Sequence, residues 1–246
     1  MSSQFTEAYR KEVLERLEGI SQQDEAIERA AQMLYETECA GGRIYTFGTG
    51  HSHMMGQDIY ARAGGYAKVY PILEIELTLL THPTKSTRIE RTAEYADVLE
   101  ELYHLKAGDT VIACSNSGRN ALVVEYISRL KKQGVKIIAI TSLTHSKTIA
   151  SRHPSGLRLF ELADVVLDNC APYGDAAVSL SPEVAMGPVS TLTGCYLSQM
   201  VMGRFVEKLL ADGREAPVFA SSNRDGADER NQELMRKYVL KHWSEN

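Results

Sequence analysis

Short runs of apolar, β-forming residues recur along the chain, and stretches with helical spacing separate them. The runs occupy residues 43–47, 68–77, 109–114, 135–141 and 163–169. Strands that are buried on both faces lose the alternation of apolar and polar residues, as these runs do. Repeated strand and helix units place helices on both faces of a parallel sheet. The pattern therefore predicts an α/β fold with a doubly wound, mostly parallel, five-stranded sheet.

Apolar residues at intervals of three and four predict the helices around this sheet. The predicted helices span residues 5–18, 22–40, 52–63, 86–102, 118–133, 148–153, 183–210 and 228–243, with a break at Pro188. No linker rich in Pro, Gly or Ser divides the 246 residues, so we expect one domain with a core over about 25–212. Residues 1–24 add an N-terminal helix, and residues 213–246 add a C-terminal loop and helix.

Charge and cysteine usage exclude some classes of function. The net charge is −5, with acidic and basic residues interspersed, so no basic stripe is available for nucleic acid. No stretch approaches the roughly 18 apolar residues of a membrane span, and the first residues lack an apolar signal region. The four cysteines are scattered without CxxC or zinc-finger spacing, which favours free thiols in a reducing compartment. We therefore expect a cytoplasmic protein that binds neither nucleic acid nor membrane.

Two loops in this pattern are rich in glycine and small polar residues. "GTGHSHMMGQD" begins at Gly48 after the first strand, and "CSNSGRN" begins at Cys114, at the end of the third. In doubly wound sheets, ligands bind beyond the carboxyl ends of the strands, where the strand order reverses. The two loops are therefore the first candidates for a binding site.

The residue types in these loops favour an anion as ligand. Gly50 and Gly118 let the backbone approach a ligand closely, and the helix after each loop directs free N–H groups toward it. Short neutral donors surround the glycines: Ser52, Ser115, Ser117 and Asn120. Because neither loop has the lysine of a P-loop, a sugar phosphate fits better than a nucleoside triphosphate with its metal. Such residues also serve as plain helix caps, but two loops at one sheet edge favour the anion site.

Three segments resemble known families of sugar-phosphate proteins. "TVIACSNSGRNALVVEYISRLKKQGVKIIAIT" resembles the signature of the SIS (sugar isomerase) phosphosugar-binding domain, with Asn120 where Ser or Thr is usual. "AGGRIYTFGTGHSH" resembles the first loop of phosphoheptose isomerases, and "SPEVAMGPVSTLTG" is similar to a helix start in N-acetylmuramic acid 6-phosphate etherases. The resemblance covers about residues 25–212 and implies a SIS-type sheet, similar to flavodoxin and Rossmann folds.

Carried onto this chain, the resemblance implies a site for a sugar phosphate or an amino-sugar phosphate. The phosphate would be held by Ser52, Ser115, Ser117 and Asn120, with backbone access at Gly50 and Gly118. SIS domains commonly assemble with their sites near subunit contacts, which implies a homodimer or homotetramer.

The resemblance does not carry over the usual catalytic acid. Phosphoheptose isomerases and the etherases have a glutamate on the helix after the first loop, where this chain has Arg62. Asp58 stands where the isomerase has a metal-ligating histidine. We therefore expect no metal and no cofactor.

Four other residues are candidates for acid–base chemistry or ligand contact. His51 and His53 lie inside the first loop, where an imidazole beside a phosphate titrates near neutrality. Glu183 lies in the etherase-like stretch, and Glu94 resembles the position of a second etherase glutamate. Each has a structural alternative: loop packing for the histidines, a helix first turn for Glu183, and an exposed helix face for Glu94.

Other polar positions are assigned no function. The histidines outside the first loop show no metal-binding spacing; they are His82, His104, His145, His153 and His242. The polar segment 221–231 is interpreted as a turn followed by a helix cap, with a lid or a loop between subunits as the alternative.

The sequence thus predicts a sugar-phosphate isomerase of the aldose–ketose type, similar to the phosphoheptose isomerases. A phosphosugar sensor or regulatory protein that binds without turnover is the first alternative, and Arg62 in place of the acid favours it. An amino-sugar-phosphate etherase is the second alternative, supported by Glu94 and by the resemblance over residues 182–194.

Overall fold

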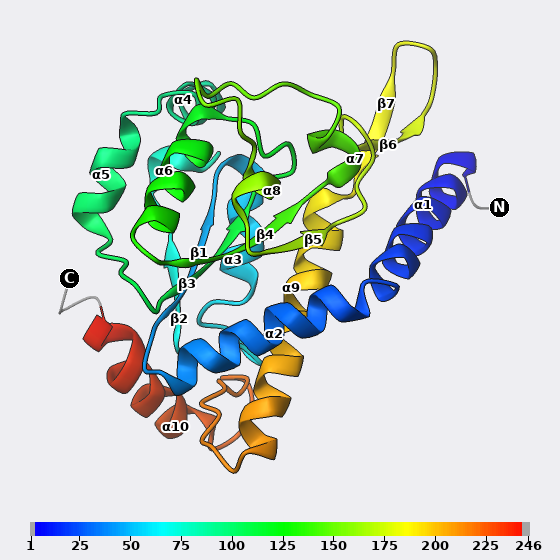
Figure 1. The fold of residues 1–246 in the computed structure, drawn as a ribbon. Coiled ribbons are helices and arrows are strands. Elements are labelled where there is room, and N and C mark those ends of the chain that lie inside the picture. Colours follow the sequence, from blue (N-terminus) through cyan, green and yellow to red (C-terminus); the bar gives the residue numbers. More distant parts are fainter. Residues whose placement is uncertain (1–2, 243–246) are drawn as a thin grey trace.

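A five-stranded parallel sheet forms the centre of the molecule (Figure 1). The computed structural model describes residues 3–242. The strands lie in the order β2-β1-β3-β4-β5, and each neighbouring pair is parallel. Their bounds are β1 Ile44–Gly48, β2 Val69–Ile72, β3 Thr110–Cys114, β4 Lys136–Thr141 and β5 Val165–Asp168. The predicted fold class and strand number are confirmed.

Helices cover both faces of the sheet, because each inner strand is buried on both sides. Tyr45, Phe47 and Val111 point to one hydrophobic cluster, which α5 (Tyr95–Leu102), α6 (Ala121–Lys132) and α8 (Leu159–Leu162) close. Ile44, Ile112 and Ile138 point to the other cluster, which α2 (Asp24–Cys39), α3 (His53–Asp58) and α9 (Ser190–Ala211) close. Successive residues of a strand thus serve opposite faces. This explains why the strands read as continuous apolar runs.

The strand order reverses between β1 and β3, and this position fixes where a ligand site can lie. From β1 the chain moves outward to β2, and it then returns to form β3 on the other side of β1. Gly48 at the end of β1 is in register with Cys114 at the end of β3. The two loops that follow, including the 3-10 turn η1 (Gly50–Ser52), therefore leave the same edge of the sheet side by side.

Several predicted helices are shorter than expected. The helix predicted over 52–63 ends at Asp58, and the chain then turns through Ala61 with a positive φ of 46°. The helix predicted over 86–102 is two helices, α4 (Pro83–Ile89) and α5, with a turn between them. The strand predicted to reach 77 ends at Ile72, and η2 (Ile75–Leu77) follows. The segment 148–153 is not helical, because the helix there, α7 (Leu143–Ser146), begins earlier at the Ser142 cap.

The prediction of helix from Glu183 onward was wrong. Strands β6 (Ala176–Ser179) and β7 (Ala185–Pro188) form an antiparallel hairpin, and α9 begins only at Ser190. Pro188 has no backbone N–H and fits at the end of an edge strand. The hairpin and α1 (Gln4–Ser21) project side by side from the body (Figure 1). The Tyr9 hydroxyl donates to the Pro188 carbonyl at 2.9 Å, which joins them.

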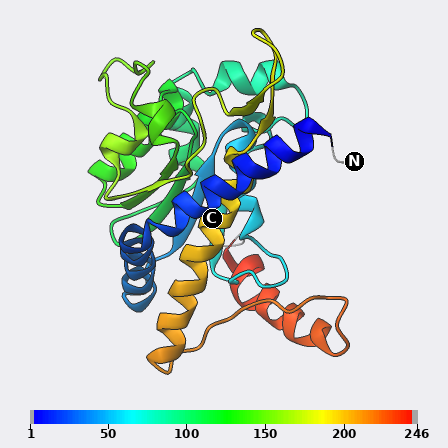
Figure 2. The same ribbon diagram turned by 90° about the vertical axis from the view of Figure 1, so that its right-hand side faces the viewer.

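The C-terminal helix covers the opposite edge of the sheet from the two loops (Figures 1 and 2). Helix α10 (Ala227–Leu234) continues as a π-helical segment, η3 (Met235–Leu240). Its apolar side packs in a small cluster with Ala67 and Phe219. The predicted end of this helix, Trp243, lies outside the described residues. Within residues 3–242, no helix has the length and apolar character that a bilayer span requires.

Candidate functional site

The loops after β1 and β3 enclose a cavity of about 300 Å³ at the point where the strand order reverses. Six of the residues that the sequence predicted to bind or react line it: Gly50, His51, Ser52, Ser115, Ser117 and Asn120. Four segments distant in sequence complete the wall through Thr49, Glu90, His145 and the pair Gly174–Asp175. The cavity is therefore built mainly from neutral donors, with one glutamate and two histidines.

The first loop needs glycine for steric reasons. A Cβ on Gly48 would lie 2.6 Å from the carbonyl oxygen of Ser52, so no larger residue fits this tight turn. Gly50 has a φ of +56°, in the left-handed region that glycine adopts without strain. Ser52 occupies the N-cap position of α3, but its side chain makes no capping hydrogen bond. Its hydroxyl thus lines the cavity without serving as a cap.

The second loop turns sharply at Gly118, whose φ is +59°. The Ser115 hydroxyl oxygen accepts from the Gly118 N–H at 3.2 Å and stabilises this turn. Asn120 is the N-cap residue of α6, yet its side chain does not cap the helix. Its Oδ1 instead accepts from Nη1 of Arg152 at 2.7 Å. Capping therefore accounts for neither Ser52 nor Asn120, the two residues at the cap positions.

Glu90 is a site residue that sequence reasoning missed. It follows α4, and its backbone carbonyl accepts from the Leu122 N–H at 3.2 Å, which holds it beside the start of α6. Its Oε2 accepts from the Thr49 hydroxyl at 2.9 Å. Burial raises the pKa of this carboxyl, while the hydrogen bonds from Thr49 and Asn120 and the charges of Arg91 and Arg152 oppose the rise. A carboxyl group in such surroundings is suited to proton transfer.

His145 is the second residue that sequence reasoning missed. Its Nδ1 accepts from the Gly174 N–H at 3.2 Å, so the proton of the neutral ring lies on Nε2. The ring packs against Tyr173 with 4.7 Å between centroids. Burial lowers the pKa of His145, the charge of Arg119 lowers it further, and Asp175 opposes both effects. The imidazole is therefore held neutral, with an N–H available.

The structure places the other candidates outside the cavity. Glu183 is exposed in the turn between β6 and β7, because the segment is a projecting hairpin and not the start of a helix. Glu94 is exposed at the N-terminus of α5, one helical turn beyond Glu90 in the sequence. His53 is buried under the first loop, where its Nδ1 contacts the Gly50 carbonyl. Arg62 pairs with Asp58 on the surface.

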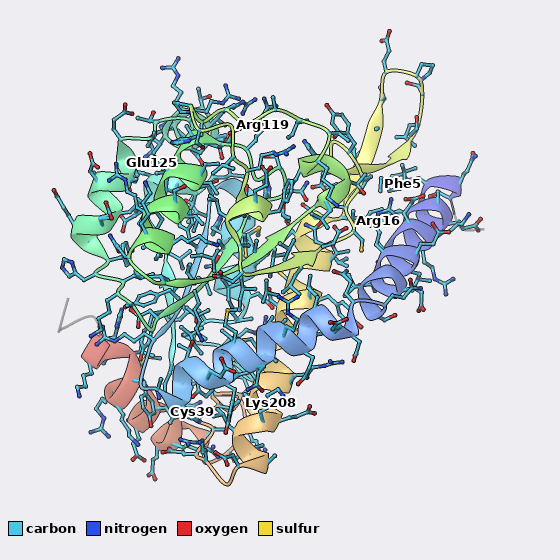
Figure 3. All side chains as sticks on the ribbon, viewed as in Figure 1. Phe5, Arg16, Cys39, Arg119, Glu125 and Lys208 are labelled. Atoms are coloured by element: carbon cyan, nitrogen blue, oxygen red, sulfur yellow. The ribbon has the colours of Figure 1, made fainter. Side chains whose placement is uncertain are left out.

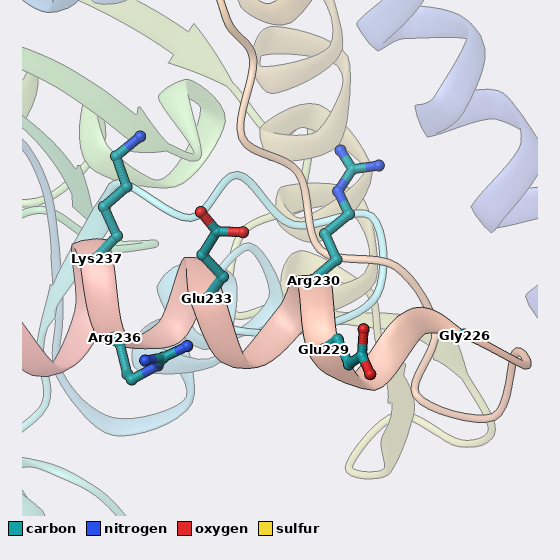
Figure 4. Close-up of a pocket in the computed structure, with 6 residues that line it drawn as sticks. All are labelled: Gly226, Glu229, Arg230, Glu233, Arg236 and Lys237. Atoms are coloured by element: carbon teal, nitrogen blue, oxygen red, sulfur yellow. The ribbon is translucent and has the colours of Figure 1, made fainter.

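A second depression lies on the outer face of the C-terminal helix (Figure 4). Acidic and basic side chains line it, and they point in different directions instead of converging on one point. Among residues 3–242, no group of three or more His, Cys, Asp or Glu side chains is arranged to hold a metal ion. The cavity beside Ser117 and Glu90 remains the candidate site.

Comparison with known sequences identifies the family. The family model described as SIS domain matches residues 8–142, which is more than half of the chain. A UPF0309 protein of Halalkalibacterium halodurans is 44% identical over 88% of this chain and 90% of its own length. A UPF0309 protein of Oceanobacillus iheyensis is 37% identical over 95% of this chain and 96% of its own length.

Solved structures show the same fold at low sequence identity. Phosphoheptose isomerase of Neisseria gonorrhoeae has a TM-score of 0.52 at 17% identity, covering 81% of this chain and 96% of that chain. The Vibrio vulnificus NanR protein complexed with ManNAc-6P has a TM-score of 0.53 at 15% identity, covering 96% and 70%. An E. coli protein in complex with a sugar phosphate has a TM-score of 0.51 at 17% identity, covering 83% and 89%. These matches confirm the resemblance read from the two loops: the chain belongs to the SIS domain family and, within it, groups with the UPF0309 proteins.

Proposed function

We propose that this protein binds a sugar phosphate or an amino-sugar phosphate and catalyses its aldose–ketose isomerisation. One observation carries the proposal: a glutamate with a raised pKa lines the same 300 Å³ cavity as two glycine- and serine-rich loops. Two proteins of the same fold, one in complex with ManNAc-6P and one with another sugar phosphate, support the class of ligand.

The phosphate is held by the hydroxyls of Ser52, Ser115 and Ser117 and by backbone N–H groups at Gly50 and Gly118. The amino-terminal end of α6 adds free N–H groups and a favourable dipole. Asn120 takes a more limited part than the sequence suggested, since Arg152 already occupies its Oδ1. Only its Nδ2 is left to donate.

Glu90 acts as the base in this proposal. It removes the proton from C2 of the aldose, and the resulting enediol receives that proton at C1. An imidazole, His145 or His51, donates a proton to O1 and accepts the proton of the O2 hydroxyl, so that the ketose forms without net loss of protons. Glu183 and Glu94 take no part, because both are exposed outside the cavity.

Binding without turnover is the second candidate function. The observation that favours it is Arg62, which replaces the expected acid and is paired with Asp58 away from the cavity. An etherase reaction has no comparable support, since the two glutamates that suggested it lie outside the cavity.

A ligand screen tests the proposal. The purified protein is heated with hexose, heptose and amino-sugar phosphates, each compared with its unphosphorylated sugar, since a ligand of the folded state raises Tm by mass action. Each ligand that binds is then followed by NMR in D2O for conversion and for deuterium incorporation. Phosphate-dependent binding with conversion supports the isomerase, and binding without conversion or exchange supports the sensor.

Matched variants locate the site in that screen. Ser117→Ala removes a hydroxyl from the cavity wall and should weaken binding, whereas Ser222→Ala on the exposed loop before α10 should not. If no phosphorylated sugar binds, both candidate functions are wrong.

We also propose that the protein forms a homodimer or homotetramer through an α3–α9 face, which comprises Met54, Thr191, Leu192, Cys195 and Tyr196. Three of these side chains are apolar and exposed: Met54 at 42%, Leu192 at 42% and Tyr196 at 40%. A depression lined in part by Met54 and Cys195 lies on the same face. Burial of this face against a second copy would remove apolar area from water.

A further inference from the structure

Arg152 reaches the candidate site from a loop that the sequence did not connect with it. Its Nη1 donates to Oδ1 of Asn120 at 2.7 Å, and its backbone N–H donates to the Arg119 carbonyl at 2.8 Å. The loop is anchored on both sides of Arg152: the Ser151 hydroxyl donates to the Leu157 carbonyl at 2.6 Å, and His153 Nε2 lies 2.8 Å from Oε2 of Glu125.

These anchors place Arg152 against the start of α6. Figure 3 shows Arg119 in the turn before α6 and Glu125 on the helix itself. The loop with Arg152 is thus tied to the turn before α6 through its backbone and to the helix through His153. Its guanidinium is therefore held at the end of the cavity where Asn120 lies.

The Arg152 bond determines which way the Asn120 amide faces. An asparagine side chain has one oxygen that accepts and one NH2 that donates, and arginine can only donate. Because Arg152 takes the oxygen, the NH2 is directed to the other side, where the Asn120 side chain is a hydrogen-bond partner of the Glu90 carboxyl. Thr49 donates to Glu90 as well. The Glu90 carboxyl is therefore bound by two donors from two different loops.

We propose that Arg152 is a positioning residue for Glu90, which acts by holding the Asn120 amide with its NH2 toward the Glu90 carboxylate. The proposal rests on the proposed function in one respect, namely that Glu90 is the base. Without Arg152 the amide is free to rotate and to present its oxygen, which repels a carboxylate. The relay thus keeps the base oriented and able to ionise in a partly buried position.

Other charged groups also act on Glu90, and the test has to separate them from the relay. Arg91 follows it in the chain, and Arg152 itself exerts a direct charge effect. His51, His145 and Asp175 line the same cavity from the first loop, α7 and the start of the hairpin. A simple loss of positive charge would raise the pKa of Glu90 even if Asn120 played no part.

A double-mutant cycle separates the relay from the direct charge effect. The pKa of Glu90 is measured by 13C NMR on protein labelled at the glutamate carboxyl carbons, and the Glu90 resonance is the one that disappears in Glu90→Gln. Four proteins are compared: the unsubstituted chain, Arg152→Ala, Asn120→Ala and the double variant. Arg236→Ala on the C-terminal helix serves as the control for removal of one distant positive charge (Figure 4).

The relay predicts that Arg152→Ala raises the pKa of Glu90 by about one pH unit in the unsubstituted chain. In the Asn120→Ala background the same substitution should raise it by less than half as much. Arg152→Lys, which keeps the charge but has no planar donor pair, should give an intermediate value. Equal rises in both backgrounds, or no rise at all, would overturn the proposal. Thermal unfolding of each variant verifies that it is folded.

These titrations are made without a substrate, so they do not depend on turnover. If the cycle shows coupling and no sugar phosphate is converted, the proposed isomerase function fails and the relay stands. If a sugar phosphate is converted and the cycle shows no coupling, the relay fails and the isomerase stands. For a converted sugar phosphate, Arg152→Ala should also move the rise of kcat with pH to higher pH and leave KM within about threefold.

Discussion

Glu90 has opposite effects on reaction and on stability, and one substitution measures both. Glu90→Gln keeps the shape of the side chain but cannot accept a proton, so we expect conversion of any sugar-phosphate substrate to fall at least about 100-fold. Binding of the phosphate should persist, because the serine hydroxyls and loop backbone are unchanged. Conversion is measured by NMR and binding by thermal shift. The matched control is Glu94→Gln, which lies on the surface and should leave both unchanged.

The same substitution should stabilise the protein at neutral pH. Burial raises the pKa of Glu90 above its ordinary value of 4.5, so the folded state binds this proton more tightly than the unfolded state. Stability therefore falls as pH rises from about 4.5 through the raised pKa, because the carboxylate becomes charged in a buried position. Glu90→Gln removes this loss. Its Tm should exceed that of the unsubstituted chain at pH 8, and the two should converge at pH 4. A lower Tm at pH 8 would contradict this account.

Gly118 carries the turn of the second loop, and its replacement tests the steric argument. A Cβ there would lie 3.1 Å from Cβ of Leu159 in a backbone with a φ of +59°. The left-handed conformation alone costs an alanine about 1–2 kcal/mol. Gly41 has a φ of +76° and nothing within 4 Å of its added Cβ, so it bears only the conformational cost. We expect Gly118→Ala to lower the free energy of unfolding more than Gly41→Ala in urea denaturation. Equal losses would refute a steric role for Leu159.

The sequence predicted the site residues that lie close together in the chain. Ser115, Ser117 and Gly118 belong to one short loop, and the strand before it fixes where that loop lies. Glu90 and His145 come from other segments, and they reach the cavity only because of the strand order and the break between α4 and α5. No local pattern distinguishes Glu90 from Glu94, since both lie in the same amphipathic stretch. The position of that break decides which of them is buried.

At the level of elements, Asp175 joins the hairpin to the start of α9. Its Oδ1 accepts from the N–H groups of Val189 and Ser190 at 3.0 and 2.8 Å, and its Oδ2 accepts from the Ser190 hydroxyl at 2.6 Å. Asp175→Ala leaves these donors without a partner, so we expect a loss of about 1–2 kcal/mol. For a chain of this length that corresponds to a fall in Tm of about 2–8 °C.

A smaller effect of the isosteric variant would confirm the capping role of Asp175. Asp175→Asn keeps an oxygen that accepts and tolerates the positive φ of 69° at this position. Calorimetry should place its Tm between those of the unsubstituted chain and Asp175→Ala. Asp225→Ala on the exposed loop before α10 is the control for loss of one acidic charge. If all three variants melt together, Asp175 does not stabilise α9.

This cap also explains why the start of α9 was not predicted from sequence. The side chain that satisfies its first N–H groups is 14 residues away from Val189, beyond any local capping pattern. Residues 184–188 have an apolar content that suits helix and strand equally. The hairpin forms because its two strands pair with each other and pack on α1. Both are tertiary contacts that periodicity does not reveal.

For the whole molecule, the sheet was the most predictable part. Its five strands follow from apolar runs whose length and flanking glycines exclude helices. The strand order depends on how the crossover helices divide between the two faces, which the sequence pattern did not specify. The candidate cavity nevertheless lies at the carboxyl edge that the sequence indicated, since in any doubly wound order the loops meet there.

The proposed assembly is tested on the α3–α9 face. Leu192 is 42% exposed on α9, so Leu192→Glu should leave the fold of one chain intact while placing a charge in an apolar contact between copies. We expect the mass measured by light scattering after gel filtration to fall from the oligomer toward 27.3 kDa, the mass of one chain. Leu102→Glu is the matched control, because Leu102 is similarly exposed, at 47%, on α5 across the sheet. An unsubstituted chain that already elutes as a monomer, or equal behaviour of the two variants, would show that copies do not meet through this face.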